Sequence, residues 1–173
     1  MVRYVIIGCG MMGREHIRNI SLLDYTSIVG IYEPNAEMRR LAKLLVPNTQ
    51  FFDSLSKLLQ EIDFDCLVVA TPNFRHLTDL YKILQFVTKP ILIEKPIATS
   101  FEDTLKLIEL SKKYEAPIWV AMEYRYMPVL QCFIEEEKFV TGGSTMLSIR
   151  EHRFPFLEKV DNWNRFNKFT GGT

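Results

Sequence analysis

A glycine-rich segment near the N-terminus has the spacing of a phosphate-binding turn. Gly8-Cys9-Gly10-Met11-Met12-Gly13 follows a short apolar run and opens a helical pattern. Glycines at these positions allow a tight turn, close approach of a pyrophosphate to the main chain, and close packing of helix on strand, while the helix N-terminus attracts the anion. We therefore expect a dinucleotide to contact Gly8, Gly10, Met11, Met12 and Gly13.

Glu33 bears on which dinucleotide binds. It ends the next apolar run, 20 residues beyond Gly13 (33 − 13). A carboxylate at this position accepts hydrogen bonds from the ribose hydroxyls of NAD and repels the 2′-phosphate of NADP. The combination favours NAD over NADP. The alternative is that the glycines form an ordinary turn and that Glu33 is a solvated strand end.

A second polar segment, Thr71-Pro72-Asn73, ends another predicted strand, and His76 follows it. Ligands of an open parallel sheet bind beyond the carboxyl ends of its strands, so this segment should line the same crevice. Thr71, Pro72, Asn73 and His76 are therefore candidate cofactor contacts. An Asn turn followed by a proline at a helix start explains the same pattern, and His16 and His76 are equally well explained as helix histidines bonded to main chain.

Lys95 is the candidate for proton transfer. It lies in Glu94-Lys95-Pro96, at the end of a further predicted strand in the same crevice. Desolvation there, together with the positive nicotinamide ring of an oxidised cofactor, would favour the neutral amine, which can accept a proton. Glu94 and Lys95 are also candidate cofactor contacts. A surface ion pair between the two is the alternative.

The elements that position these residues alternate along the chain. Apolar runs rich in β-branched residues predict strands at residues 4–8, 28–32, 66–70, 91–94 and 118–122, with a short extra strand at 51–52. Helical patterns lie at residues 13–23, 36–45, 54–61, 76–86 and 101–114. This alternation is typical of βαβ units, and hence of an α/β fold with a parallel sheet covered on both faces.

The pattern changes after Met122. A predicted helix at residues 128–137 is followed at 145–153 by alternating polar and apolar residues, which are typical of an antiparallel strand with one wet face. We therefore expect a second domain to begin near residue 123.

Composition excludes several classes of protein. The 173 residues are 47% hydrophobic and 24% charged, which is typical of a globular protein, and 21 basic residues balance 21 acidic ones. A net charge of zero provides no field for nucleic acid or an anionic membrane. The three cysteines lack CxxC spacing, and no signal peptide or membrane segment is evident. We therefore expect a cytoplasmic protein with no metal site, nucleic-acid partner or membrane partner.

Taken in order, these segments resemble the Gfo/Idh/MocA family of NAD(P)-dependent oxidoreductases. The resemblance covers the whole chain and rests on Gly8 to Gly13 with His16, Glu33-Pro34-Asn35, Ala70-Thr71-Pro72-Asn73 with His76, Glu94-Lys95-Pro96, Tyr124-Arg125-Tyr126-Met127-Pro128, and Trp163 with Gly171-Gly172. It implies a Rossmann doubly wound parallel sheet at residues 1–122. At 123–173 it implies the incomplete start of an α/β domain for substrate and oligomerisation, with a mainly antiparallel open sheet.

The resemblance also implies a reaction. Lys95 would be the catalytic lysine of a dehydrogenase that transfers a hydride between NAD and a secondary hydroxyl or carbonyl of a sugar, cyclitol or related polyol. Candidate substrate contacts are Lys95, Arg125, Trp163 and Arg165. The Lys95-Pro96 peptide is expected to be cis, and the full-length protein is expected to be a homo-oligomer.

The chain departs from the family pattern at its end. It stops at Thr173, before the stretch with an Asp and a His that the family carries beyond the Gly-Gly element. We therefore expect an N-terminal portion of a longer enzyme, too short to be active alone. The alternative is an NAD-binding module or a truncated remnant without turnover. The substrate and the direction of reaction stay open.

Overall fold

A six-stranded parallel sheet forms the centre of the computed structural model, which describes residues 1–137, 148 and 166–171. The strand order is β3-β2-β1-β4-β5-β6, and every neighbouring pair is parallel. The strands are β1 (Val2–Ile7), β2 (Thr26–Tyr32), β3 (Gln50–Phe52), β4 (Cys66–Val69), β5 (Ile91–Ile93) and β6 (Ile118–Val120). This is the strand order of a doubly wound Rossmann sheet, so the predicted fold class of the first domain is confirmed.

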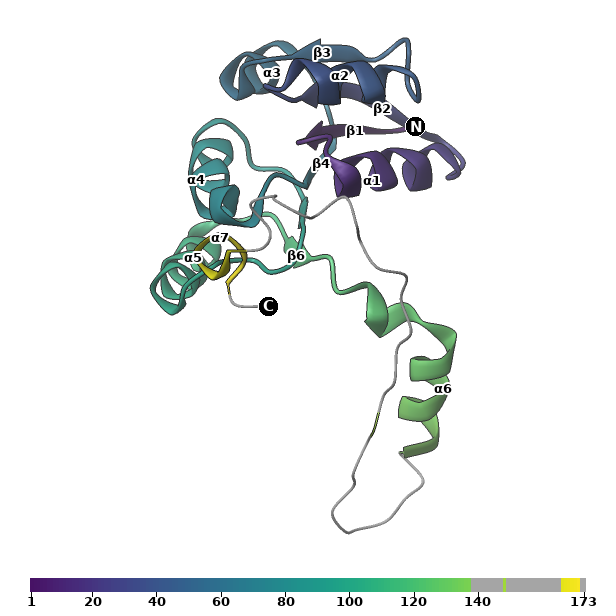
Figure 1. Ribbon diagram of the computed structural model, residues 1–173, viewed down its shortest axis with the longest axis vertical. Coiled ribbons are helices and arrows are strands. Elements are labelled where there is room, and N and C mark those ends of the chain that lie inside the picture. The colour runs from purple at the N-terminus through teal and green to yellow at the C-terminus, as the bar shows by residue number, and fades with distance from the viewer. Residues whose placement is uncertain (138–147, 149–165, 172–173) are drawn as a thin grey trace.

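Helices connect the strands (Figure 1). They are α1 (Met11–Ser21), α2 (Ala36–Lys43), α3 (Leu55–Glu61), α4 (His76–Phe86) and α5 (Phe101–Lys113), with a 3₁₀ turn, η1 (Asn73–Arg75), before α4. Side chains of Asn35, Ser54 and Ser100 accept main-chain N–H groups at the starts of α2, α3 and α5. Such capping explains why these helices begin where the sequence predicts. Helix α1 begins two residues earlier than predicted because the glycine segment itself forms its first turn.

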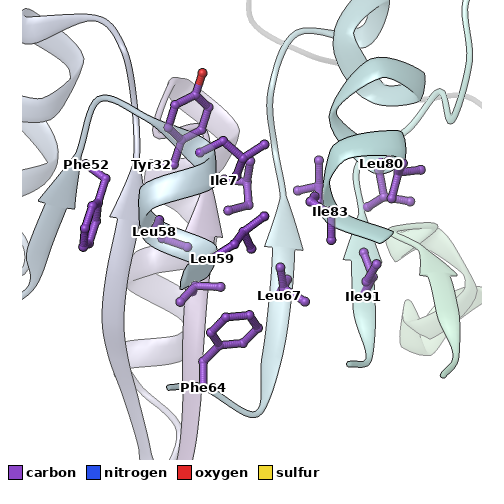
Figure 2. Packing of buried hydrophobic residues seen from close by; sticks show 14 of the residues in the cluster. Ile7, Tyr32, Phe52, Leu58, Leu59, Phe64, Leu67, Leu80, Ile83 and Ile91 are labelled. Atoms are coloured by element: carbon purple, nitrogen blue, oxygen red, sulfur yellow. The ribbon is translucent and has the colours of Figure 1, made fainter. Parts of the chain in front are cut away.

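The core lies on both faces of the sheet. Within β1, Val5 and Ile7 pack on one face and Ile6 on the other, as the alternation of side chains along a strand requires. The first face is covered by leucines and isoleucines of α3 and α4, among them Leu58 and Ile83 (Figure 2). Residues of α1 and α2 cover the second face. This burial fixes the register of the strands, and with it the positions of the turns at their carboxyl ends.

The chain beyond β6 leaves the sheet. A second 3₁₀ turn, η2 (Glu123–Tyr126), leads into α6 (Pro128–Glu137), which extends away from the sheet in Figure 1. A short helix, α7 (Asn167–Thr170), contacts η1. The strand predicted at 145–153, apart from Ser148, and the candidate residues Trp163 and Arg165 lie outside the described residues, as does the antiparallel sheet expected for a second domain. Within the described residues, no helix is long and apolar enough to span a membrane.

Candidate nucleotide-binding and active site

The predicted cofactor contacts and Lys95 lie together at the carboxyl ends of the strands. They follow the carboxyl ends of β1, β2, β4 and β5, and β2, β1, β4 and β5 are adjacent in the sheet. These residues are Gly8 to Gly13 after β1, Glu33 after β2, Thr71 to His76 after β4, and Glu94 with Lys95 after β5. The fold therefore places side chains from four separate segments around a single edge, which is where ligands of such sheets bind.

The three glycines of the turn have different surroundings. Gly8 has a positive φ of 91°, and a Cβ there would lie 2.9 Å from the main chain of Ala70 and Thr71. A Cβ at Gly13 would overlap the carbonyl oxygen of Gly8. A Cβ at Gly10 would meet no atom within 4 Å. The first and third glycines are therefore required by packing, whereas the second leaves space for a ligand to approach the main chain.

The start of α1 fits an anion. Its N-cap is Gly10, no side chain caps it, and its first turn contains no acidic residue. The N–H groups and the helix dipole there favour a negative charge. Nearby, the Thr71 hydroxyl is buried and has no hydrogen-bond partner among the described residues. A capless helix start and an unpaired buried hydroxyl are both features that a bound dinucleotide would satisfy.

Glu33 is anchored to the glycine turn. Its carboxylate is buried, with 8% of the residue exposed, and one oxygen accepts the Cys9 N–H at 2.9 Å. The other oxygen accepts the Asn35 N–H, also at 2.9 Å. The Arg39 guanidinium donates to the carbonyl oxygens of Glu33 and Pro34. The carboxylate is thus held at the end of β2, where it could accept ribose hydroxyls with its remaining lone pairs.

Cys9 lies inside the same turn but is no candidate nucleophile. Its thiol is buried and contacts the Met38 carbonyl. Burial and the nearby Glu33 carboxylate together raise the pKa of the Cys9 thiol to about 12. The thiol therefore stays protonated at neutral pH, and a protonated thiol is a poor nucleophile.

The segment after β4 is fixed by contacts on two sides. His76 is fully buried, and its ring nitrogens lie 2.9 Å from the carbonyl oxygens of Pro96 and Thr71. The Asn73 amide donates to the Thr170 carbonyl of α7, and the Phe74 and Phe169 rings pack with their centroids 5.1 Å apart. The His76 ring is therefore occupied by main chain, as the alternative interpretation of the sequence has it. Its contact with a cofactor stays a prediction.

Glu94 contacts a helix rather than the neighbouring lysine ammonium. The residue is buried, with 7% exposed, and one carboxylate oxygen lies 2.7 Å from His16 Nε2 on α1. The other oxygen accepts the main-chain N–H of Lys95 at 3.2 Å. The sequence placed His16 in the glycine motif or explained it as a helix-surface or core histidine. It did not predict Glu94 as the partner, because the two residues are 78 positions apart.

The Lys95 ammonium bonds a residue that the sequence did not single out. Its Nζ donates to Glu123 Oε1 at 2.6 Å and lies 5.3 Å from the centre of the Tyr124 ring. The two side chains of the ion pair are 42% and 52% exposed. The Lys95 side chain is therefore more exposed to solvent than we expected for a desolvated crevice. The Lys95-Pro96 peptide is cis, as expected.

Glu123 can be placed near Lys95 only once β5 and β6 are known to be neighbours. It follows Met122 directly and begins the η2 turn, which also contains Arg125, a candidate substrate contact whose side chain is exposed. Parallel strands β5 and β6 are neighbours, so residues just beyond their carboxyl ends can meet. This reasoning places Glu123 near Lys95.

Comparison with protein families places this geometry in context. The family model described as "Oxidoreductase family, NAD-binding Rossmann fold" (GFO_IDH_MocA) matches residues 2–122. An inositol 2-dehydrogenase from Corynebacterium glutamicum (strain R) is 31% identical over 131 residues, which are 73% of this chain and 38% of that protein. A 2,7-anhydro-N-acetylneuraminate hydratase from Escherichia coli (strain K12) is 32% identical over 115 residues, 65% of this chain and 29% of that protein.

Solved structures resemble the fold as well. The myo-inositol dehydrogenase from Lactobacillus casei in complex with NAD(H) and myo-inositol gives a TM-score of 0.74 at 26% identity, covering 80% of this chain and 42% of that one. The WlbA dehydrogenase from Bordetella pertussis in complex with NADH and UDP-GlcNAcA gives 0.72 at 27% identity, with the same coverage of both chains. This chain thus spans less than half the length of the relatives it matches. On the strength of the family match, it belongs to the Gfo/Idh/MocA family of oxidoreductases with an NAD-binding Rossmann fold.

Proposed function

We propose that this chain forms the cofactor-binding part of an NAD-dependent dehydrogenase that acts on a secondary hydroxyl or carbonyl of a sugar, cyclitol or related polyol. The observation that carries the proposal is Lys95, whose ammonium lies at the carboxyl end of β5, two strands from the glycine turn of β1. The relatives that are named inositol dehydrogenases support the assignment of a polyol as the substrate. We also propose a domain boundary after Met122, supported by a family match that ends there.

The residues present fit a nicotinamide dinucleotide. The N-terminus of α1 and Gly10 would hold the pyrophosphate, Met11, Met12 and Gly13 would complete that turn, and Glu33 would accept the ribose hydroxyls. Thr71, Pro72 and Asn73 would lie along the cofactor from the β4 side. Glu33 favours NAD over NADP because its carboxylate would repel a 2′-phosphate. When bound, the cofactor supplies the hydride acceptor or donor.

Lys95 would manage the proton. In the oxidative direction, the Lys95 amine, after passing its own proton through Glu123, would accept the proton of the substrate hydroxyl while the carbon-bound hydrogen leaves as hydride. The resulting ammonium is held by the Glu123 carboxylate, whose exposed side chain can pass the proton to solvent. Arg125, Trp163 and Arg165 remain candidate substrate contacts. A homo-oligomer and a cytoplasmic location remain parts of the proposal, and the free thiols of all three cysteines support a reducing compartment.

The test is a Lys95→Met substitution in the protein that carries this chain. Met replaces the stem of the Lys side chain with an unbranched stem of the same four-atom length and removes the amine that carries the proton. We expect kcat/KM on myo-inositol and a panel of related polyols to fall by about 100- to 10,000-fold, the usual contribution of a general acid or base. NADH binding, measured by the fluorescence of the bound nucleotide, should persist.

Two outcomes separate the proposal from its rival. Unchanged kcat/KM in the Lys95→Met variant would remove Lys95 from the mechanism. NADH binding by the wild-type protein without turnover of any polyol would favour a nucleotide-binding module without catalysis. Because one relative is named a hydratase, the panel should also include a 2,7-anhydro sugar acid.

A further inference from the structure

Two histidines reach the Lys95 segment from the two helices that follow the nucleotide-facing turns. His16 lies on α1, which begins at the glycine turn, and His76 is the first residue of α4, which follows the Thr71-Pro72-Asn73 segment. Each ring contacts a residue immediately beside Lys95: Glu94 on one side and Pro96 on the other. The main chain that carries Lys95 is therefore held from both sides.

The first contact passes through a buried carboxylate. His16 Nε2 lies 2.7 Å from Glu94 Oε1, and Glu94 Oε2 accepts the Lys95 N–H at 3.2 Å. A buried carboxylate must be matched by hydrogen-bond partners, because leaving it unpaired costs free energy. Without His16, the carboxylate would be drawn toward other partners, and the Lys95 N–H would lose a fixed acceptor.

The second contact links two loops through one ring. His76 Nδ1 lies 2.9 Å from the Pro96 carbonyl, and Nε2 lies 2.9 Å from the Thr71 carbonyl. A neutral imidazole carries one N–H and donates to one carbonyl at a time, whereas the imidazolium donates to both. In either form the ring fills the space between the nucleotide-facing loop and the cis Lys95-Pro96 peptide.

We propose that His16 and His76 are positioning residues that hold Lys95 in register with the two nucleotide-facing turns, His16 through the carboxylate of Glu94 and His76 through the carbonyl of Pro96. The inference rests on the proposed function of Lys95. It assigns His76 an indirect role through main chain instead of the direct cofactor contact that the sequence suggests. The placement of the proton carrier is then set by the same two helices that begin at the nucleotide.

Amide side chains separate the contacts, because Gln places an N–H donor near His Nε2 and Asn places one near Nδ1. His16→Gln keeps the donor toward Glu94, and His16→Leu removes it at similar volume. His76→Asn keeps the donor toward Pro96, and His76→Gln keeps only the one toward Thr71. In the protein that carries this chain, we expect His16→Leu and His76→Gln to lower kcat by about 10- to 100-fold, the effect of small misplacement. His16→Gln and His76→Asn should stay near wild type.

A second readout needs no turnover. The reaction of Lys95 with an amine-specific acylating reagent is followed by mass spectrometry, with Lys112, another exposed and ion-paired lysine, as the internal reference. We expect the ratio of the two labelling rates to change about fivefold in His16→Leu and His76→Gln, the shift that one lost hydrogen bond produces. The two conservative variants should keep the wild-type ratio. If His16→Leu fails to fold, the His76→Asn and His76→Gln pair carries the test.

The two proposals fail in different ways. If His16→Leu and His76→Gln label and turn over like the wild type while Lys95→Met loses turnover, the positioning role is wrong and the proposed function stands. If Lys95→Met keeps full turnover, the proposed proton-carrying role of Lys95 is wrong, and the labelling ratio alone decides whether the histidines position Lys95. If the wild-type protein binds NADH but turns over no polyol, the proposed function itself is wrong.

Discussion

The glycine turn and the Lys95 segment share one edge of the sheet, but they are built differently. At the turn, Gly8 and Gly13 pack against main chain, and both oxygens of buried Glu33 bond main-chain N–H groups. The Lys95 ammonium instead bonds an exposed side chain of η2, just past the proposed domain boundary. The glycine turn is therefore fixed inside the Rossmann unit, whereas the Lys95 ammonium depends on side chains at the margin of that unit. Substitutions at the first should affect folding, and those at the second should affect turnover.

The largest expected effect breaks the turn itself. Gly13→Ala places a Cβ against the Gly8 carbonyl and should destabilise the protein by about 3 kcal/mol or more. Gly10→Ala is the matched control, because its Cβ meets no atom within 4 Å. Urea unfolding should show the loss for Gly13→Ala alone. If Gly10→Ala keeps its stability and also binds NADH like the wild type, the space beside Gly10 is not where the pyrophosphate lies.

Glu33→Gln tests whether the turn selects the cofactor. The amide keeps the shape of the side chain but removes the charge, while the Arg39 guanidinium stays beside the end of β2. We expect the affinity ratio of NADPH to NADH to rise about tenfold, which corresponds to about 1.4 kcal/mol. Titration of both reduced nucleotides by fluorescence measures it. An unchanged ratio would mean that Glu33 serves only to anchor the turn.

His76 joins the two regions, and it should make stability depend on pH. Burial lowers the pKa of His76 from its ordinary value of 6.5, while bonds to the Pro96 and Thr71 carbonyls and the charges of Asp79 and Glu94 oppose that shift. The unfolded chain therefore binds a proton more readily than the folded one. Stability from this residue is present above pH 6.5 and is lost as the pH falls toward the lower folded value. Urea midpoints from pH 8 to pH 5 should fall more for the wild type than for His76→Gln.

The smallest effect on stability belongs to the Lys95 ion pair. Both partners are exposed, so Glu123→Gln should change the free energy of unfolding by less than about 1 kcal/mol. Its kcat should still fall, because the Lys95 ammonium loses its acceptor. Glu109→Gln, which removes an exposed ion pair with Lys112 on α5, is the control. Equal kcat in Glu123→Gln and Glu109→Gln would show that Glu123 of the η2 turn does not contribute to the reaction.

Local sequence patterns predict much of this fold, whereas the long-range side-chain contacts could not be predicted from them. The glycine turn, the strands and the helices follow from patterns among neighbouring residues, so the sequence predicts them. The carboxyl ends of β4 and β5 were likewise expected to share the crevice. The side-chain partners at these strand ends were not expected. His16 meets Glu94, and Lys95 meets Glu123, only after the sheet forms. Residue type alone could not tell an ion pair of Glu94 with Lys95 from the contacts observed.

The short outer strands have a practical consequence. Both edges of the sheet, β3 and β6, contain only three residues. An edge this short offers few unpaired N–H and C=O groups to a strand from another molecule, which limits aggregation by strand addition. Trp119 on β6 is nevertheless exposed. The Rossmann unit should therefore resist strand addition at these two edges, and Trp119 is one of several exposed apolar side chains through which copies could instead associate.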